Sequence, residues 1–93
     1  MKISIITATY NSKKNVGRCI QSVVDQAYPH IEHIVIDGAS TDETMEIVKS
    51  FPSVTKCITE PDNGIYDALN KGIQRATGDI IGFVLSYDTN SSF

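Results

Sequence analysis

The 93-residue sequence has no tryptophan, only three prolines and two cysteines, and no long apolar run. A helix that crosses a bilayer needs about 20 consecutive apolar residues, so the sequence predicts no transmembrane segment. The stretch from residue 1 to residue 6 has one basic residue and is too short for a signal peptide. We therefore expect a cytoplasmic protein. In a reducing compartment, Cys19 and Cys57 are expected to be free, buried thiols.

The sequence also lacks an excess of basic residues. It has 8 Lys and Arg against 11 Asp and Glu, for a net charge of −3. A nucleic-acid groove needs clustered Lys and Arg, so no nucleic-acid partner is expected. Also missing are the Gly-x-Gly-x-x-Gly fingerprint, a Walker-type Gly-Lys-Ser/Thr, a Ser-His-Asp arrangement and any Cys/His metal cluster. A small phosphate-bearing ligand is still allowed, because helix N-termini and one or two cations can hold it.

Apolar residues make up 41% of the chain and charged residues 20%, which is typical of a globular domain. Short apolar runs predict four strands, and amphipathic segments between them predict three helices. The strands are expected at residues 3–8, 31–36, 54–59 and 80–85, and the helices at 13–27, 40–51 and 65–76. This alternation predicts an α/β fold with a mainly parallel sheet between two helical layers, and one domain over residues 1–93.

Two details refine the expected fold. Ser40 and Glu43 have the spacing of a capping box, so the second helix is expected to open at Ser40. Residues 80–85 are nearly all apolar, which predicts a central strand.

Polar residues follow each predicted strand, and the carboxyl ends of parallel strands meet at one edge, where such sheets bind ligands. Asp37 follows three β-branched residues and precedes Gly38, where a ligand can approach the backbone. We therefore expect Asp37→Ala to weaken ligand binding with little change in melting temperature, although an aspartate here can also cap a turn. Tyr10 can cover the edge or stack on a base. Asp67 and Lys71 are four residues apart and can simply pair on a helix.

Four segments in order resemble the family 2 glycosyltransferases, in particular the branch that builds bacterial exopolysaccharides and cell-surface polysaccharides. The resemblance runs over nearly the whole chain, from residue 3 to about residue 88. The matching segments are residues 5–11 (IITATYN), 34–44 (IVIDGASTDET), 60–73 (EPDNGIYDALNKGI) and 78–83 (GDIIGF).

The resemblance implies the GT-A fold, a Rossmann-like α/β/α architecture that binds a nucleotide-sugar, usually with Mn²⁺ or Mg²⁺. It implies transfer of a sugar, with inversion, from a UDP-sugar to a saccharide or lipid-linked acceptor, by an enzyme that lies peripherally at the inner face of the membrane. In this reading Asp37 accepts a hydrogen bond from the base, Asn63 holds the base or ribose, and Lys71 is a cation near the nucleotide. The nucleotide-sugar site implied in this way comprises Thr7, Ala8, Tyr10, Asp37, Asn63, Lys71 and Ser86, with Asp88 as the metal ligand.

The sequence departs from the family at two points. The fourth strand ends in Leu85-Ser86-Tyr87-Asp88, where the family usually has Asn-Ser-Asp-Asp or a similar acidic motif. A weakened metal site is therefore expected. The chain also stops where the acceptor-binding half and its general base are expected, so we expect a GT-A fold truncated after about the fourth strand that binds donor without full activity.

Two alternatives compete with a glycosyltransferase. The chain can be a non-catalytic nucleotide-binding or self-associating module, forming a homo-oligomer through an uncovered sheet edge. It can also be a receiver domain with Asp37 as phospho-acceptor. Such a site needs an acidic pair after the first strand, where this chain has Thr7, Thr9 and Asn11.

Overall fold

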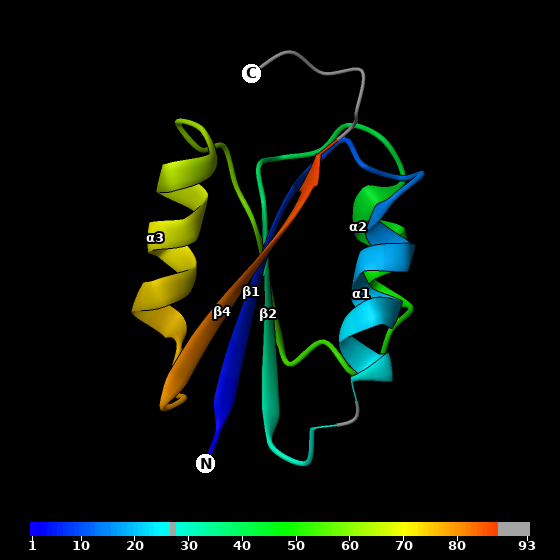
Figure 1. The fold of residues 1–93 in the computed structure, drawn as a ribbon. Coiled ribbons are helices and arrows are strands. Elements are labelled where there is room, and N and C mark those ends of the chain that lie inside the picture. The colour runs from blue at the N-terminus through cyan, green and yellow to red at the C-terminus, as the bar shows by residue number, and fades with distance from the viewer. Residues whose placement is uncertain (27, 88–93) are drawn as a thin grey trace.

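The computed structural model describes residues 1–26 and 28–87. These residues form a four-stranded sheet of order β3-β2-β1-β4 in which every neighbouring pair is parallel. Helix α3 covers one face, and α1 and α2 cover the other (Figure 1). The predicted three-layer α/β fold is confirmed. The elements are β1 (Ile3–Tyr10), α1 (Val16–Asp25), β2 (Ile31–Asp37), α2 (Thr44–Lys49), β3 (Lys56–Thr59), α3 (Ile65–Arg75) and β4 (Ile80–Tyr87).

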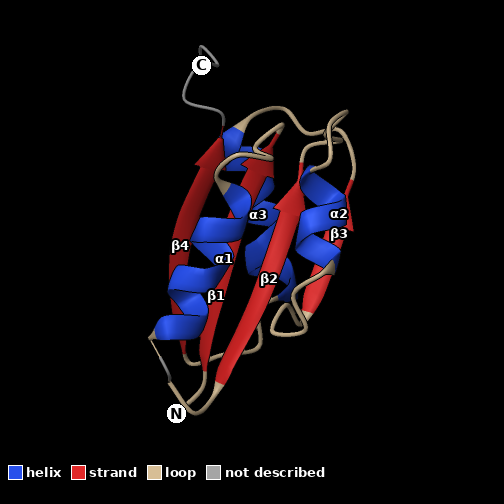
Figure 2. Ribbon diagram, turned by 90° about the vertical axis from the view of Figure 1, so that its right-hand side faces the viewer, coloured by secondary structure: helices blue, strands red, loops and turns tan. Residues whose placement is uncertain are grey.

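The strands bury alternate residues against the two helical layers. Figure 2 shows the sheet from the side that α1 and α2 cover. Towards α3, the core consists of Ile6, Ala8, Ile34, Ile36 and Ala68. Towards α1 and α2, it consists of Val16, Ile20, Val35 and Val48. Both faces of β1 and β2 are therefore buried, and the polar residues of the two strands are buried with them: Ser4, Thr7, Thr9, Glu32, His33 and Asp37.

Helix α2 begins four residues later than the capping-box spacing predicted. Asp42, and not Ser40, satisfies its first turn, because Asp42 Oδ1 accepts a hydrogen bond from the Thr44 N–H at 2.9 Å. The hydroxyl of Ser40 donates to Asp37 instead. The prediction was wrong because a cap at Ser40 would have to accept a helix N–H, whereas its hydroxyl oxygen accepts the Asn11 N–H from the loop after β1.

Strand β4 lies at an edge of the sheet formed by the described residues, so the predicted central position is wrong for this part of the chain. Helix α3 packs on β1 and β2. The apolar side chains that β4 directs to the same face therefore stay uncovered, and Phe83 and Leu85 are 50% and 52% exposed. A sequence that is apolar on both faces of a strand predicts that the strand is buried. It does not show which other segment of the chain covers that strand.

The two cysteines are free, as predicted, but Cys57 is exposed and Cys19 only half-buried. The expected burial of Cys57 is wrong because β3 is the other edge strand and has four residues. Among the described residues, no helix has both the length and the apolar character that a membrane crossing demands.

His33 is a buried polar residue on the sheet face that packs against α1 and α2. Its side chain is 1% exposed, and its Nε2 lies 2.7 Å from the Thr7 hydroxyl. Burial penalises the charged imidazolium and lowers the pKa of His33 from 6.5 to about 4. His33, for which the sequence suggested no function, is therefore a neutral group that links β2 to β1.

Replacing Gly72 with alanine is expected to destabilise the protein, although alanine normally favours a helix. A Cβ at position 72 would lie 2.3 Å from Ile6 Cγ2, closer than any real contact. We expect Gly72→Ala to lower the free energy of unfolding by about 1–3 kcal/mol. Urea denaturation followed by circular dichroism measures this, with the exposed Gln74→Ala as the matched control in the same helix. A Gly72→Ala variant as stable as the wild type would contradict the close packing of α3 on β1.

The stability of the protein is expected to fall as the pH falls from about 6.5 to about 4. In this window the unfolded state binds a proton on His33 and the folded state does not, because the folded pKa is about 4. The loss reaches about 3 kcal/mol at the lower end, since one pKa unit corresponds to roughly 1.4 kcal/mol. Urea denaturation between pH 7 and pH 5 measures the slope before carboxylates titrate. In the non-titrating His33→Gln variant, the free energy of unfolding should not change with pH in this range. An equal pH dependence in both proteins would contradict the role of His33.

Candidate functional site

The loops that follow β1 and β2 form a single rim at the carboxyl end of the sheet. The Asn11 N–H donates to Ser40 Oγ at 2.8 Å, and the Thr41 N–H donates to Asn11 Oδ1 at 2.8 Å. Asn11 and Ala39 adopt positive φ angles of 44° and 64°. Asparagine tolerates this conformation, but alanine rarely adopts it. The turn at Ala39 is held by the hydrogen bonds that its neighbours Ser40 and Thr41 make with Asn11.

Asp37 holds this rim to the neighbouring strand. Its side chain is fully buried and accepts hydrogen bonds from the Ser40 N–H at 2.8 Å, the Ser40 hydroxyl, and the Thr59 hydroxyl at 2.7 Å. A carboxylate has room for about four hydrogen bonds, so a nucleotide base would have to take the last one or displace Ser40. The expected contact between Asp37 and a base stays a prediction. The expectation that Asp37 contributes little to stability does not fit this geometry.

Three other predicted site residues lie beneath the rim and not on its surface. Thr7 is fully buried and bonds to His33. Ala8 belongs to the core under α3. Ser86 is 2% exposed, and its hydroxyl lies 2.8 Å from that of Ser12. These residues support the loops, and a direct ligand contact would require the loops to move.

Tyr10 and Asn63 are the predicted site residues that are accessible at this edge. Tyr10 ends β1 and is 37% exposed. It has the same strand parity as Ile6 and Ala8, which face α3. Asn63 is exposed and precedes α3. Both residues therefore belong to the α3 side of the rim, where a planar base can meet an aromatic ring and an amide.

Two of the polar residues expected at this edge, for which no specific contact was predicted, have buried oxygen atoms that lack a hydrogen-bond partner. They are Thr9, at Oγ1, and Asp62, at Oδ2. The Asp62 carboxylate lies against Gly38, where an added Cβ would be 2.9 Å from Oδ2. The glycine after Asp37 is thus needed for contact between two loops.

Lys71 lies on α3, and its ammonium group contacts the loop before that helix. Its Nζ is 3.1 Å from Glu60 Oε1 and 3.4 Å from Asp67 Oδ2. The pairing with Asp67 that the four-residue spacing predicted is confirmed. The predicted approach of Lys71 to a nucleotide stays a prediction.

The residues described here do not form a metal site by themselves. Within residues 1–26 and 28–87, no three His, Cys, Asp or Glu residues come together in a way that could hold an ion. Asp37 already accepts three hydrogen bonds from Ser40 and Thr59. Burial opposes ionisation of Asp42, but hydrogen bonds from Thr44 outweigh this and keep its pKa below the usual value. Asp88, the predicted metal ligand, lies outside the described residues.

Two bacterial proteins are similar to this chain over nearly its whole length. A protein named as a glycosyltransferase in Mycobacterium tuberculosis (strain CDC 1551 / Oshkosh) is 41% identical over 88 residues, which cover 92% of this chain and 34% of that protein. A protein of Bacillus subtilis (strain 168) named for teichuronic acid biosynthesis, TuaG, is 34% identical over 90 residues, covering 92% of this chain and 36% of that protein. The chain therefore spans about a third of the length of these relatives.

Solved structures show the same fold. S. aureus TarS 1–349, in complex with UDP-GlcNAc, matches with a TM-score of 0.85 and 30% identity, over 92% of this chain and 26% of that one. The mannosyltransferase PcManGT of Pyrobaculum calidifontis, in complex with GDP-Man and Mn²⁺, matches with a TM-score of 0.77 and 30% identity, over 86% of this chain and 26% of that one. Both are consistent with the GT-A architecture.

A sequence model described as glycosyl transferase family 2 matches residues 4–84. The match includes β1, β2, β3 and α3 almost entirely, together with the rim loops that join the strands to the helices. By sequence and by fold, the chain belongs to glycosyl transferase family 2.

Proposed function

We propose that residues 1–93 are the donor-binding domain of a glycosyltransferase that takes a sugar from a UDP-sugar. The observation that carries this proposal is the likeness to TarS, whose structure holds UDP-GlcNAc and which matches 92% of this chain at 30% identity. The rim at the carboxyl end of the sheet supports it, because ligands of open α/β sheets bind at this edge.

The accessible residues of the rim are suited to bind the nucleoside. Tyr10 offers an aromatic face for stacking, and the Asn63 amide can both donate and accept hydrogen bonds at the edge of a uracil. Asp37 keeps the rim in shape through Ser40 and Thr59. Three further residues of the predicted site lie beneath the rim: Thr7, Ala8 and Ser86. Their burial disfavours a direct contact with the nucleotide.

Transfer of the sugar leaves a nucleoside diphosphate on which negative charge develops. A Mn²⁺ or Mg²⁺ ion bound by Asp88 and the donor's phosphate oxygens would neutralise this charge. The described residues do not complete such a site, so any ion depends on Asp88 and on the donor itself. Asp88 follows Leu85 and Tyr87, which replace polar or acidic positions of the family motif, and this favours weak metal binding.

The acceptor is proposed to be a saccharide or a lipid-linked saccharide in surface polysaccharide synthesis, with inversion at the transferred sugar. Support comes from the B. subtilis relative that is named for teichuronic acid biosynthesis. A lipid-linked acceptor would place the enzyme peripherally at the inner face of the membrane. The general base is expected in an acceptor-binding half, because the chain spans only about a third of its relatives. Self-association through β4 stays a prediction, which the exposed Phe83 and Leu85 support.

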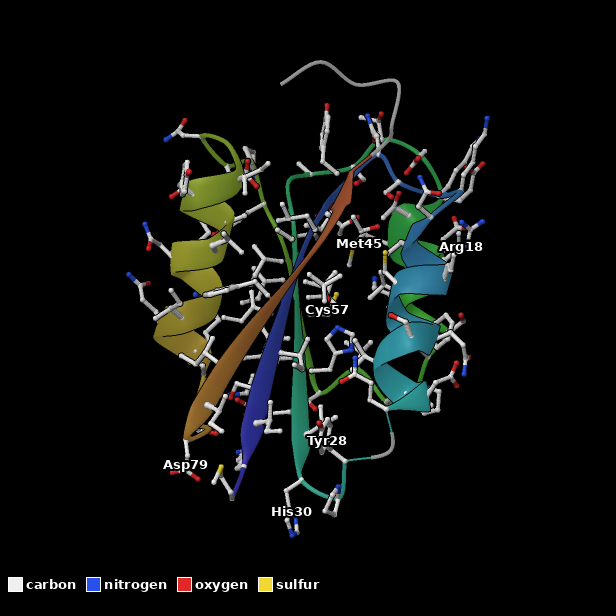
Figure 3. The ribbon with its side chains drawn as sticks, in the orientation of Figure 1. Arg18, Tyr28, His30, Met45, Cys57 and Asp79 are labelled. Carbon is white, nitrogen blue, oxygen red and sulfur yellow. The ribbon has the colours of Figure 1, made fainter. Side chains whose placement is uncertain are left out.

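The wild-type chain is expected to bind UDP at the rim. Titration with UDP and Mn²⁺, followed by amide NMR, should shift the resonances of Tyr10, Asn63 and the residues around Ala39. Tyr10→Ala should weaken UDP binding about 10-fold, since the loss of one stacking contact is worth roughly 1–3 kcal/mol. Tyr28→Ala is the matched control, because this exposed tyrosine lies near His30 at the opposite end of the sheet (Figure 3). An absence of shifts at the rim at millimolar UDP would contradict the proposed function.

Asp37→Ala is expected to lower the free energy of unfolding by about 2–4 kcal/mol, because it leaves two Ser40 groups and the Thr59 hydroxyl without their acceptor. Urea denaturation measures this loss, and the single variant Thr59→Val, which removes only one of the three bonds, should cost less. A melting temperature unchanged by Asp37→Ala would show that the carboxylate does not hold the rim.

A further inference from the structure

The loop between β3 and α3, residues 60–64, presents Asn63 and is tied to its own helix through Asp67. The Asn63 N–H donates to Asp67 Oδ2 at 3.0 Å, and the Gly64 N–H donates to Asp62 Oδ1 at 3.1 Å. The loop lies at the carboxyl end of the sheet, above α3 in Figure 1. Gly64 has a φ of 109°, a conformation that favours glycine. The position of Asn63 thus depends on whether Asp67 stays in place.

Lys71 lies one helical turn after Asp67 and fixes that carboxylate. Its Nζ is 3.4 Å from the same Asp67 Oδ2 atom that accepts the Asn63 N–H. It also donates to the Pro61 carbonyl oxygen at 3.0 Å and lies 3.1 Å from Glu60 Oε1. A lysine ammonium has three N–H donors, and these three acceptors match them in number. The geometry leaves no donor free for a phosphate.

The local charge also disfavours a phosphate at Lys71. The one ammonium faces the two carboxylates of Glu60 and Asp67, so the cluster has a net negative charge. A nucleotide phosphate would have to displace a carboxylate to reach it. The Lys71 side chain is only 19% exposed, which limits its access from solvent.

We propose that Lys71 is a positioning residue that orders residues 60–64 and so presents Asn63 to the nucleoside, without touching the phosphates. This inference rests on the proposed function and makes its site more specific. Ion pairs between partly exposed groups contribute little to global stability. The effect of Lys71 is therefore local: it selects one loop conformation through Pro61 and Asp67.

The experiment compares uridine with UDP, because the two ligands differ only in the phosphates. In Lys71→Met, both affinities are expected to fall by the same factor, about 5- to 10-fold if only a tenth to a fifth of the loops keep the competent conformation. Lys49→Met is the matched control, since it removes an exposed lysine at the end of α2. Asp67→Asn should act in the same direction as Lys71→Met, because it weakens the link between Lys71 and Asn63.

A ligand-free measurement tests the same inference independently. The amide resonances of Asn63 and Gly64 should shift and broaden in Lys71→Met and stay unchanged in Lys49→Met, while the melting temperature of both variants stays near that of the wild type. Unchanged Asn63 and Gly64 amides in Lys71→Met would overturn the proposal. So would a loss of UDP affinity with uridine affinity intact, which is the signature of a direct phosphate contact. If the wild type binds neither ligand, the proposed function fails, and the ligand-free amides still decide the role of Lys71.

Discussion

The parallel register of the strands is the constraint on which the rest of the structure depends. Thr9 of β1 is aligned with Asp37 of β2 and with Ser86 of β4, and Asp37 is aligned with Thr59 of β3. Residues that are far apart in the chain therefore end at one level and on one face. Because Asp37 lies beside Thr59 and bonds to Ser40, a single buried carboxylate holds the loop after β2 to the end of β3.

This arrangement divides the polar residues of the rim into two groups. Asp37, Thr7 and Ser86 use their polar atoms for bonds inside the protein, and burial makes those bonds costly to break. Tyr10 and Asn63 keep accessible surface and are free to meet a ligand. Such a site combines a buried, hydrogen-bonded base with a few accessible side chains at its surface. This arrangement suits recognition of a nucleoside by shape, stacking and a few hydrogen bonds.

Much of the fold and the location of the site could be predicted from the sequence. The alternation of apolar runs and amphipathic segments predicted the seven helices and strands that the described residues form, and the boundaries were less accurate. β3 begins at Lys56, two residues later than expected, and α2 at Thr44, four residues later than expected. The error at Ser40 has a physical cause: a capping box is a local pattern, and it does not register the Asn11 N–H, 29 residues away, that the Ser40 hydroxyl accepts. Among the described residues β4 lies at an edge of the sheet and not at the centre as expected, because apolar composition predicts burial without showing which segment covers the strand.

The sequence by itself determined the class of fold, the edge at which a ligand is expected and the family, because periodicity and motif spacing are local properties. Only the tertiary structure decided which polar side chains are free. Whether Thr7 faces a ligand or His33, or whether Lys71 meets a phosphate or the carboxylates of Glu60 and Asp67, depends on distances between elements. Such distances follow from packing and from competition among hydrogen-bond acceptors, and neither can be derived from the spacing of residues along the chain.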